Sequence, residues 1–79
     1  MKSPINCMEA LRRLSEDATL ELYDRLRAAE RAIKHYLEQA GNPGERQSML
    51  LALDNEIATE AGEFWAAVRD IIGQLRAQG

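Results

Sequence analysis

The residues that could perform acid, base or nucleophilic chemistry are few in this chain of 79 residues. It contains one cysteine, Cys7, and one histidine, His35. Helical spacing places Cys7 on an apolar face and His35 on a polar face, so the two do not form a nucleophile with its base. The 13 acidic residues are scattered over positions that we expect mostly to face solvent. We therefore predict no catalytic residue and no enzymatic activity.

Metal and cofactor chemistry also lacks its usual ligands in this sequence. A structural zinc site takes four ligands, usually cysteine and histidine, and this chain has one of each. The sequence contains no glycine-rich phosphate loop and no nucleophile elbow. We predict no metal site and no cofactor, which leaves binding to another protein as the expected mode of action.

Charge and hydropathy restrict the partners and the compartment. The formal net charge of -3 comes from 10 basic and 13 acidic residues, which are spread along the chain without a basic stripe. This distribution argues against nucleic acid and anionic membrane as targets. No apolar run approaches the roughly 20 residues that cross a bilayer, so we expect no membrane insertion. A single cysteine and a start without the apolar segment of a signal peptide favour a cytoplasmic protein.

Two helices are predicted before the middle of the chain. Asn6 and Glu9 have the spacing of a capping box, which predicts a short helix over about residues 7–14. Ser15 and the acidic pair after it have the pattern of another N-cap. The apolar series that follows predicts a long helix over about residues 16–40. Whether the short helix is separate or continues into the long one stays open at this stage.

Four turn-forming residues, Gly41-Asn42-Pro43-Gly44, predict a turn over residues 41–44. Beyond it, apolar residues at intervals of three and four predict a second long helix over about residues 45–77. Its apolar series is Leu50, Leu53, Ile57, Ala61, Phe64, Val68, Ile71 and Leu75. The predicted fold class is all-α, an antiparallel helical hairpin of two long helices with a short N-terminal helix, in one domain over residues 1–79.

A hairpin of this kind leaves apolar surface for which it has no second layer. On the last helix, Leu51, Ala58, Trp65 and Ile72 are spaced by seven residues and form a row beside the main seam. Gly62 lies on the flank of this row, where a small residue lets another helix approach closely. We interpret the row as a candidate partner-binding surface with Trp65 as its anchor. The alternative is that the N-terminal helix covers it within the chain.

A second candidate surface lies on the first long helix. Leu20 points almost opposite the main seam, and Tyr23 sits between the two faces. Because a single exposed leucine is common in soluble proteins, these positions also have a simple explanation without any partner. They remain candidate partner contacts because the hairpin is expected to need one.

The order of a short capped helix, a long helix, a tight turn and another long helix resembles the small co-chaperones of type III secretion systems, the YscE/SsaE-like family. The resemblance lies in the segments Met8-Glu9-Ala10-Leu11, Leu26-Arg27-Ala28-Ala29 and Leu50-Leu51-Ala52-Leu53, with Ser15 and Ile57. It implies a cytoplasmic hairpin that binds a larger helical-repeat chaperone and helps to keep a needle or translocator subunit unassembled before export. The chain departs from the family in Arg46-Gln47-Ser48, which supplies no aromatic residue, and in Trp65.

A different class of function uses the same apolar faces. Two copies of a helical hairpin can pair as a four-helix bundle, and such a homodimer could regulate or inhibit another protein. A chain that stays soluble only with a helical-repeat partner favours the co-chaperone. A homodimer that is stable alone favours the regulator.

Overall fold

The computed structural model describes residues 3–78, and these residues form helices and no strand. The helices are α1 (Ile5–Glu16), α2 (Leu22–Leu37), α3 (Pro43–Ile57) and α4 (Glu63–Gln78). The predicted all-α class is therefore confirmed. The prediction of two long helices is wrong, because this part of the chain divides into four helices of 12 to 16 residues.

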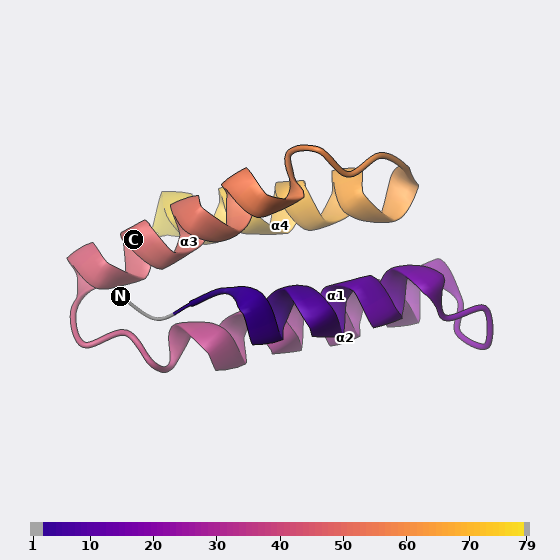
Figure 1. Cartoon of the computed structure of the whole chain (residues 1–79), viewed down its shortest axis with the longest axis horizontal. Coiled ribbons are helices and arrows are strands. Elements are labelled where there is room, and N and C mark those ends of the chain that lie inside the picture. The colour runs from indigo at the N-terminus through magenta and orange to yellow at the C-terminus, as the bar shows by residue number, and fades with distance from the viewer. Residues whose placement is uncertain (1–2, 79) are drawn as a thin grey trace.

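The four helices form two stacked layers (Figure 1). In one layer α1 and α2 lie side by side and run in opposite directions, and in the other layer α3 and α4 do the same. Helix α2 joins the layers, because it packs against α4 and also touches α3. The bundle measures 36 × 21 × 20 Å along its principal axes.

The N-terminal segment forms a separate helix, which answers the question that the sequence left open. Helix α1 continues through Glu16, and α2 begins only at Leu22. Ser15 therefore does not cap a helix, and its hydroxyl donates to the Arg12 carbonyl, 2.7 Å away, within the last turns of α1. The predicted long helix over residues 16–40 is shorter at both ends, because α2 ends at Leu37.

Asn42 fixes the start of α3 just where the turn residues lie. Its side-chain Oδ1 accepts a hydrogen bond from the Glu45 backbone N–H at 2.8 Å, and Pro43 occupies the first turn, where a missing donor costs nothing. The Glu45 carboxylate accepts from the N–H of Gly41, the residue before the cap, at 3.4 Å. Residues 38–42 thus connect the two layers.

The predicted long helix over residues 45–77 is interrupted at residues 58–62. Helix α3 ends at Ile57 and α4 begins at Glu63. Gly62 has a φ of 122°, a value that only glycine adopts at little cost, and no other described residue has a positive φ. Helical spacing could not reveal this break, because the apolar positions on its two sides stay in phase with a single helix.

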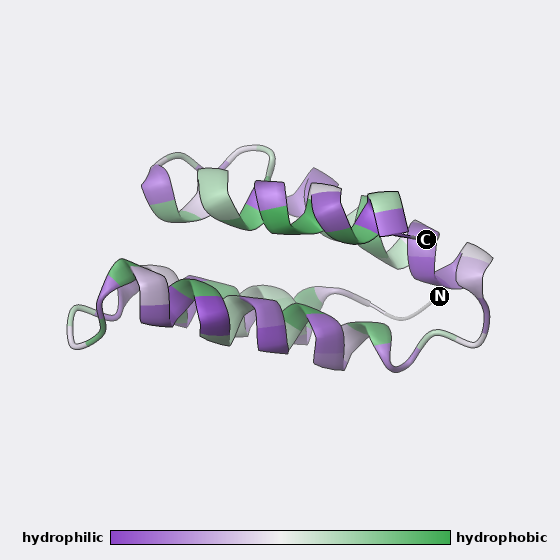
Figure 2. Cartoon of the chain, turned by 180° about the vertical axis from the view of Figure 1, so that it is seen from behind, coloured by the Kyte–Doolittle hydropathy of each residue, from purple (hydrophilic) through white to green (hydrophobic). Residues whose placement is uncertain are grey.

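A single apolar core lies between the two layers, and every helix contributes to it. In Figure 2 the hydrophobic stretches of each layer lie along the side that faces the other layer. The buried residues are Cys7, Met8, Leu11, Ala29, Ile33, Tyr36, Leu37, Met49, Leu50, Leu53, Ile57, Phe64, Trp65, Val68, Ile72 and Leu75. The second layer that we expected from a partner is thus supplied by the chain itself.

Trp65 and Ile72 belong to this core, so half of the predicted surface row is internal. Trp65 is 5% exposed and Ile72 is fully buried. The Trp65 ring meets the edge of the Phe64 ring with centroids 5.3 Å apart and planes at 85°, a favourable aromatic geometry. The interpretation of Trp65 as an exposed anchor is wrong, because the reversal of the chain after α3 leaves it in the apolar core.

The neighbouring leucines of α3 give a matched test of the core. Leu50 is fully buried whereas Leu51 is 46% exposed. We expect Leu50→Ala to lower the free energy of unfolding by about 2 to 5 kcal/mol, because it removes packed methyl groups and leaves a cavity. Leu51→Ala should change it by less than about 0.5 kcal/mol. Urea unfolding followed by circular dichroism measures both, and equal effects would contradict the assignment of the core.

Trp65 and Tyr23 provide a second test of which aromatic side chains belong to the core. We expect Trp65→Ala to lower the free energy of unfolding by about 3 to 5 kcal/mol, because a fully packed indole is lost from the core. Tyr23→Ala, which removes a ring that is 68% exposed, should have little effect on the same urea curve. A Trp65→Ala variant as stable as the parent chain would place the indole outside the core.

Candidate partner-binding surface

The structure does not assemble the row that the seven-residue spacing predicts. Leu51 lies on α3 with about half of its surface exposed, and Ala58 and Gly62 lie exposed in the linker between α3 and α4. Trp65 and Ile72 are inside the core. A spacing of seven residues produces a row only on a continuous helix, and the break at residues 58–62 separates the members of this one.

The structure keeps Leu20 and Tyr23 at the surface, at the start of α2. Leu20 is 39% exposed in the loop before the helix, and Tyr23 is 68% exposed in its first turn. The guanidinium of Arg27 lies 5.9 Å from the centre of the Tyr23 ring, within the range of a cation–π contact. We call Leu20, Tyr23 and Arg27 the α2 entrance surface.

The loop that carries Leu20 is ordered by a local hydrogen-bonded turn. The Asp17 carboxylate accepts hydrogen bonds from both the backbone N–H and the hydroxyl of Thr19, the first at 2.9 Å. These bonds lower the pKa of Asp17, because they favour the charged carboxylate. Aspartate bonded to the backbone two residues ahead is a common way to fix a turn. Leu20 therefore follows directly after a turn of fixed conformation.

Arg25 ties the same region to the other layer. Its Nη1 donates to the Ser15 carbonyl at 3.1 Å, which satisfies an acceptor at the C-terminal end of α1. Its guanidinium also lies 5.9 Å from the centre of the Phe64 ring of α4. The Nε atom of Arg25 is buried without a hydrogen-bond partner. Arg25 thus connects α1, α2 and α4 beneath the entrance surface.

Asp54 of α3 is paired across the second layer. Its Oδ1 lies 3.5 Å from Nε of Arg69 on α4. A second ion pair, between Arg12 of α1 and Glu60 of the linker, has a separation of 3.9 Å and joins the two layers at their edge. Both pairs are partly exposed, so each contributes at most about 1 kcal/mol to stability.

Cys7 and His35 line one small hollow, of about 150 Å³, between α1 and α2. The thiol is buried in the core, and burial raises the pKa of Cys7 to about 11 because it disfavours the thiolate. The thiol is therefore a poor nucleophile at neutral pH. His35 is exposed, and its Nδ1 lies 3.7 Å from the Glu38 carboxylate on the same helix. These positions agree with the predicted apolar and polar faces.

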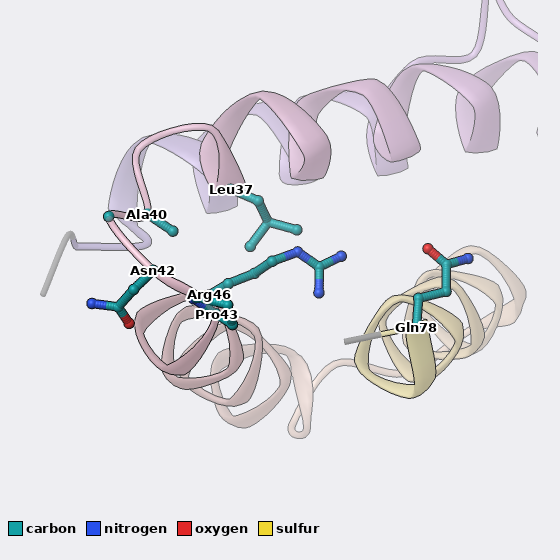
Figure 3. A pocket seen from close by; sticks show the side chains of 7 residues that line it. Leu37, Ala40, Asn42, Pro43, Arg46 and Gln78 are labelled. Carbon is teal, nitrogen blue, oxygen red and sulfur yellow. The ribbon is translucent and has the colours of Figure 1, made fainter.

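A larger hollow, of about 470 Å³, opens at the end of the bundle where α2, α3 and α4 meet (Figure 3). The side chain of Arg46 extends across it between Leu37 and Gln78. Its Nη1 donates to the Leu75 carbonyl at 3.2 Å, and Gln47 donates to the Arg76 carbonyl at the same distance. Arg46 and Gln47 thus stabilise the last turn of α4, because they donate to carbonyls that have no hydrogen-bond partner within the helix.

Sequence reasoning did not identify Arg25 and Arg27 as part of the region around the α2 entrance surface. Arg27 follows Tyr23 by four residues, and this spacing of a ring and a cation on one helix face could have identified the pair. The partners of Arg25 come from α1 and α4, which no local pattern reveals.

In residues 3–78, no three of the His, Cys, Asp and Glu side chains are grouped so that they could hold a metal ion. Within the same residues, none of the helices has the length and apolar character required to cross a membrane.

Comparison with known proteins adds no relative to this description. No family model matches the chain, and neither a curated protein nor a solved structure matches it.

Proposed function

We propose that this protein is a non-enzymatic interaction module, a cytoplasmic co-chaperone of a type III secretion system. It binds a larger helical-repeat chaperone and helps to keep a needle or translocator subunit unassembled before export. The proposal combines the resemblance to the YscE/SsaE-like family with one structural observation, the α2 entrance surface formed by Leu20, Tyr23 and Arg27.

The composition of this surface supports a role in binding. Tyrosine and arginine are among the residues most enriched at the energetic centres of protein interfaces, because each buries a large area and keeps a polar group for a hydrogen bond. Tyr23 is 68% exposed, the most exposed of the large apolar side chains among the described residues. The turn at Asp17 and the contacts of Arg25 hold the surface in place, which lowers the entropy lost on binding.

Most of the large apolar residues that carry the family resemblance stabilise the fold and do not form a surface for a partner. Met8, Leu11, Leu50, Leu53 and Ile57 are all buried in the core. They cannot touch a partner while the bundle stays closed, so the partner has to be recognised by other residues. Among the exposed residues of the matching segments, which include Glu9 and Leu51, Arg27 is the one that also belongs to the entrance surface. This overlap is the reason for choosing α2 as the docking helix.

The contact prediction uses a pair of variants on α2. Tyr23→Ala should weaken the complex with the helical-repeat chaperone by about 2 kcal/mol, or roughly 30-fold in dissociation constant, because the ring is desolvated only on association. His35→Ala, on the same helix and also at an exposed position, should leave the affinity unchanged. Isothermal titration calorimetry with the purified chaperone measures both. Equal affinities for the two variants would move the interface away from Tyr23.

The broader proposal is tested in the native cells. The chain, isolated at its natural abundance, should bring down a helical-repeat protein and a small secreted subunit in fixed ratio. Deletion of its gene should cause that subunit to be degraded or to polymerise in the cytoplasm, with loss of its secretion. Normal secretion in the deletion strain, or isolation of the chain only as a homodimer, would reject the co-chaperone and favour the regulator.

A further inference from the structure

The apolar series of the second layer continues through the linker as if the linker were helical. Seven buried positions after the turn, together with Ala61 between Ile57 and Phe64, follow one another at intervals of three and four residues, and the buried Met49 and Trp65 lie beside this series. The full series is Leu50, Leu53, Ile57, Ala61, Phe64, Val68, Ile72 and Leu75. Every member except Ala61 is buried. A loop that only reverses the chain has no need to keep helical phase.

The linker itself has few interactions that hold it bent. Ala58, Ala61 and Gly62 are exposed, and a Cβ atom on Gly62 would meet no atom within 4 Å. Within the described residues the linker makes one ion pair, between Glu60 and Arg12 at 3.9 Å, and the Glu60 N–H donates to the Ile57 carbonyl at 3.0 Å. Alanine and glutamate are strong helix formers. Local preference in this segment is therefore divided between the bend, which Gly62 permits, and a helix.

We propose that the α3–α4 hairpin opens into one continuous helix over residues 43–78 and exchanges α4 with a second copy of this chain. In the exchanged dimer each α4 packs against α2 and α3 of the other copy, with the contacts that it makes within one chain in the bundle described above. This inference does not depend on the proposed co-chaperone function.

The length of the straightened helix identifies a second copy of this chain as the partner that covers α4. A helix of 36 residues is about 54 Å long, whereas the longest dimension of the bundle is 36 Å. A straightened α4 therefore leaves its own α1–α2 layer, and the core residues Phe64, Trp65 and Val68 lose their cover. The surface that fits them is the one that α4 vacates, and a second copy opened in the same way presents it. Reciprocal exchange closes the pair with two-fold symmetry.

The energetic balance of the exchange depends on the linker. The core contacts are the same in both forms, so they cancel between one bundle and half of a dimer. The dimer gains helical hydrogen bonds over residues 58–62, and it loses the freedom of two separate molecules. The Gly62 backbone favours the bend, because its φ of 122° is open to glycine and strained for other residues.

One substitution and one insertion in the linker shift this balance in opposite directions. Gly62→Ala disfavours the positive φ and favours a helix at this position. It should raise the ratio of straight to bent linker about tenfold for each chain, and the association constant of the exchanged dimer roughly 100-fold. Insertion of Gly-Ser-Gly between Ala61 and Gly62 lengthens the loop at little cost to the bundle and opposes a helix through it. Neither change touches the core, because no atom lies near the Cβ position of Gly62 and Ala61 is exposed.

The readout is a distance within one chain between spin labels on Ser48→Cys and Ala77→Cys. Both sites are exposed, and the native Cys7 thiol is buried with a pKa of about 11, so it resists labelling. In the bent form the labels are neighbours, because Gln47 bonds to the Arg76 carbonyl beside them. In a continuous helix they are separated by about 44 Å. Dilution of the labelled chain with unlabelled chain removes distances between chains.

The experiment combines pulsed electron paramagnetic resonance with sedimentation of the same samples. We expect the parent chain to show a dimer with the long distance, in a fraction that grows with concentration. Gly62→Ala should increase this fraction, and the Gly-Ser-Gly insertion should leave only monomer and the short distance. The proposal is overturned if the parent and Gly62→Ala both keep the short distance up to their solubility limits. A dimer that retains the short distance overturns it equally, because such a dimer forms without exchange.

Discussion

The packing of α2 against α4 is the contact on which the rest of this structure depends. A pair of amphipathic helices buries one stripe on each helix and cannot form a core shielded from water by itself. Here the α1–α2 and α3–α4 layers face one another, and Ile33 of α2 and Val68 of α4 are completely shielded from solvent. Since exposed ion pairs contribute little and a helix cap about 1 kcal/mol, burial between the layers provides most of the stability.

Because the core is closed, few large apolar side chains remain at the surface to contact a partner. With Trp65 and Ile72 inside, the exposed large apolar side chains of residues 3–78 are Ile5, Leu20, Tyr23 and Leu51. Two of these four lie together at the start of α2, and Arg27 stands over the Tyr23 ring. The α2 entrance surface is consequently the place where the bundle offers an aromatic ring and a cation on a rigid support. That combination suits a protein partner, which can cover the ring and accept hydrogen bonds from the guanidinium.

The sequence predicted the helical class and several buried positions, because apolar spacing reports directly on which side chains share a face. Cys7, Leu50 and Ile57 are examples. It could not predict the break between α3 and α4, since the spacing stays in phase across residues 58–62 and Gly62 alone does not distinguish a tolerated glycine from a bend. The same limitation misplaced Trp65. A residue on the flank of an apolar arc is exposed in a two-helix hairpin and buried in a two-layer bundle, so its environment depends on tertiary contacts.

The alternatives of one bundle and an exchanged pair follow from how little of the energy resides in the linker. Residues 58–62 carry no buried side chain, and their ion pair between Glu60 and Arg12 is partly exposed, so they contribute little to holding the layers together. The core can be completed by α4 of the same chain or of another without any new contact. Under that condition the choice rests on small terms, the backbone preference of Gly62, the helix propensity of its neighbours and the concentration of the chain. The in-phase apolar series keeps both solutions available, because it places the same side chains on the inner face of a bent and of a straight second layer.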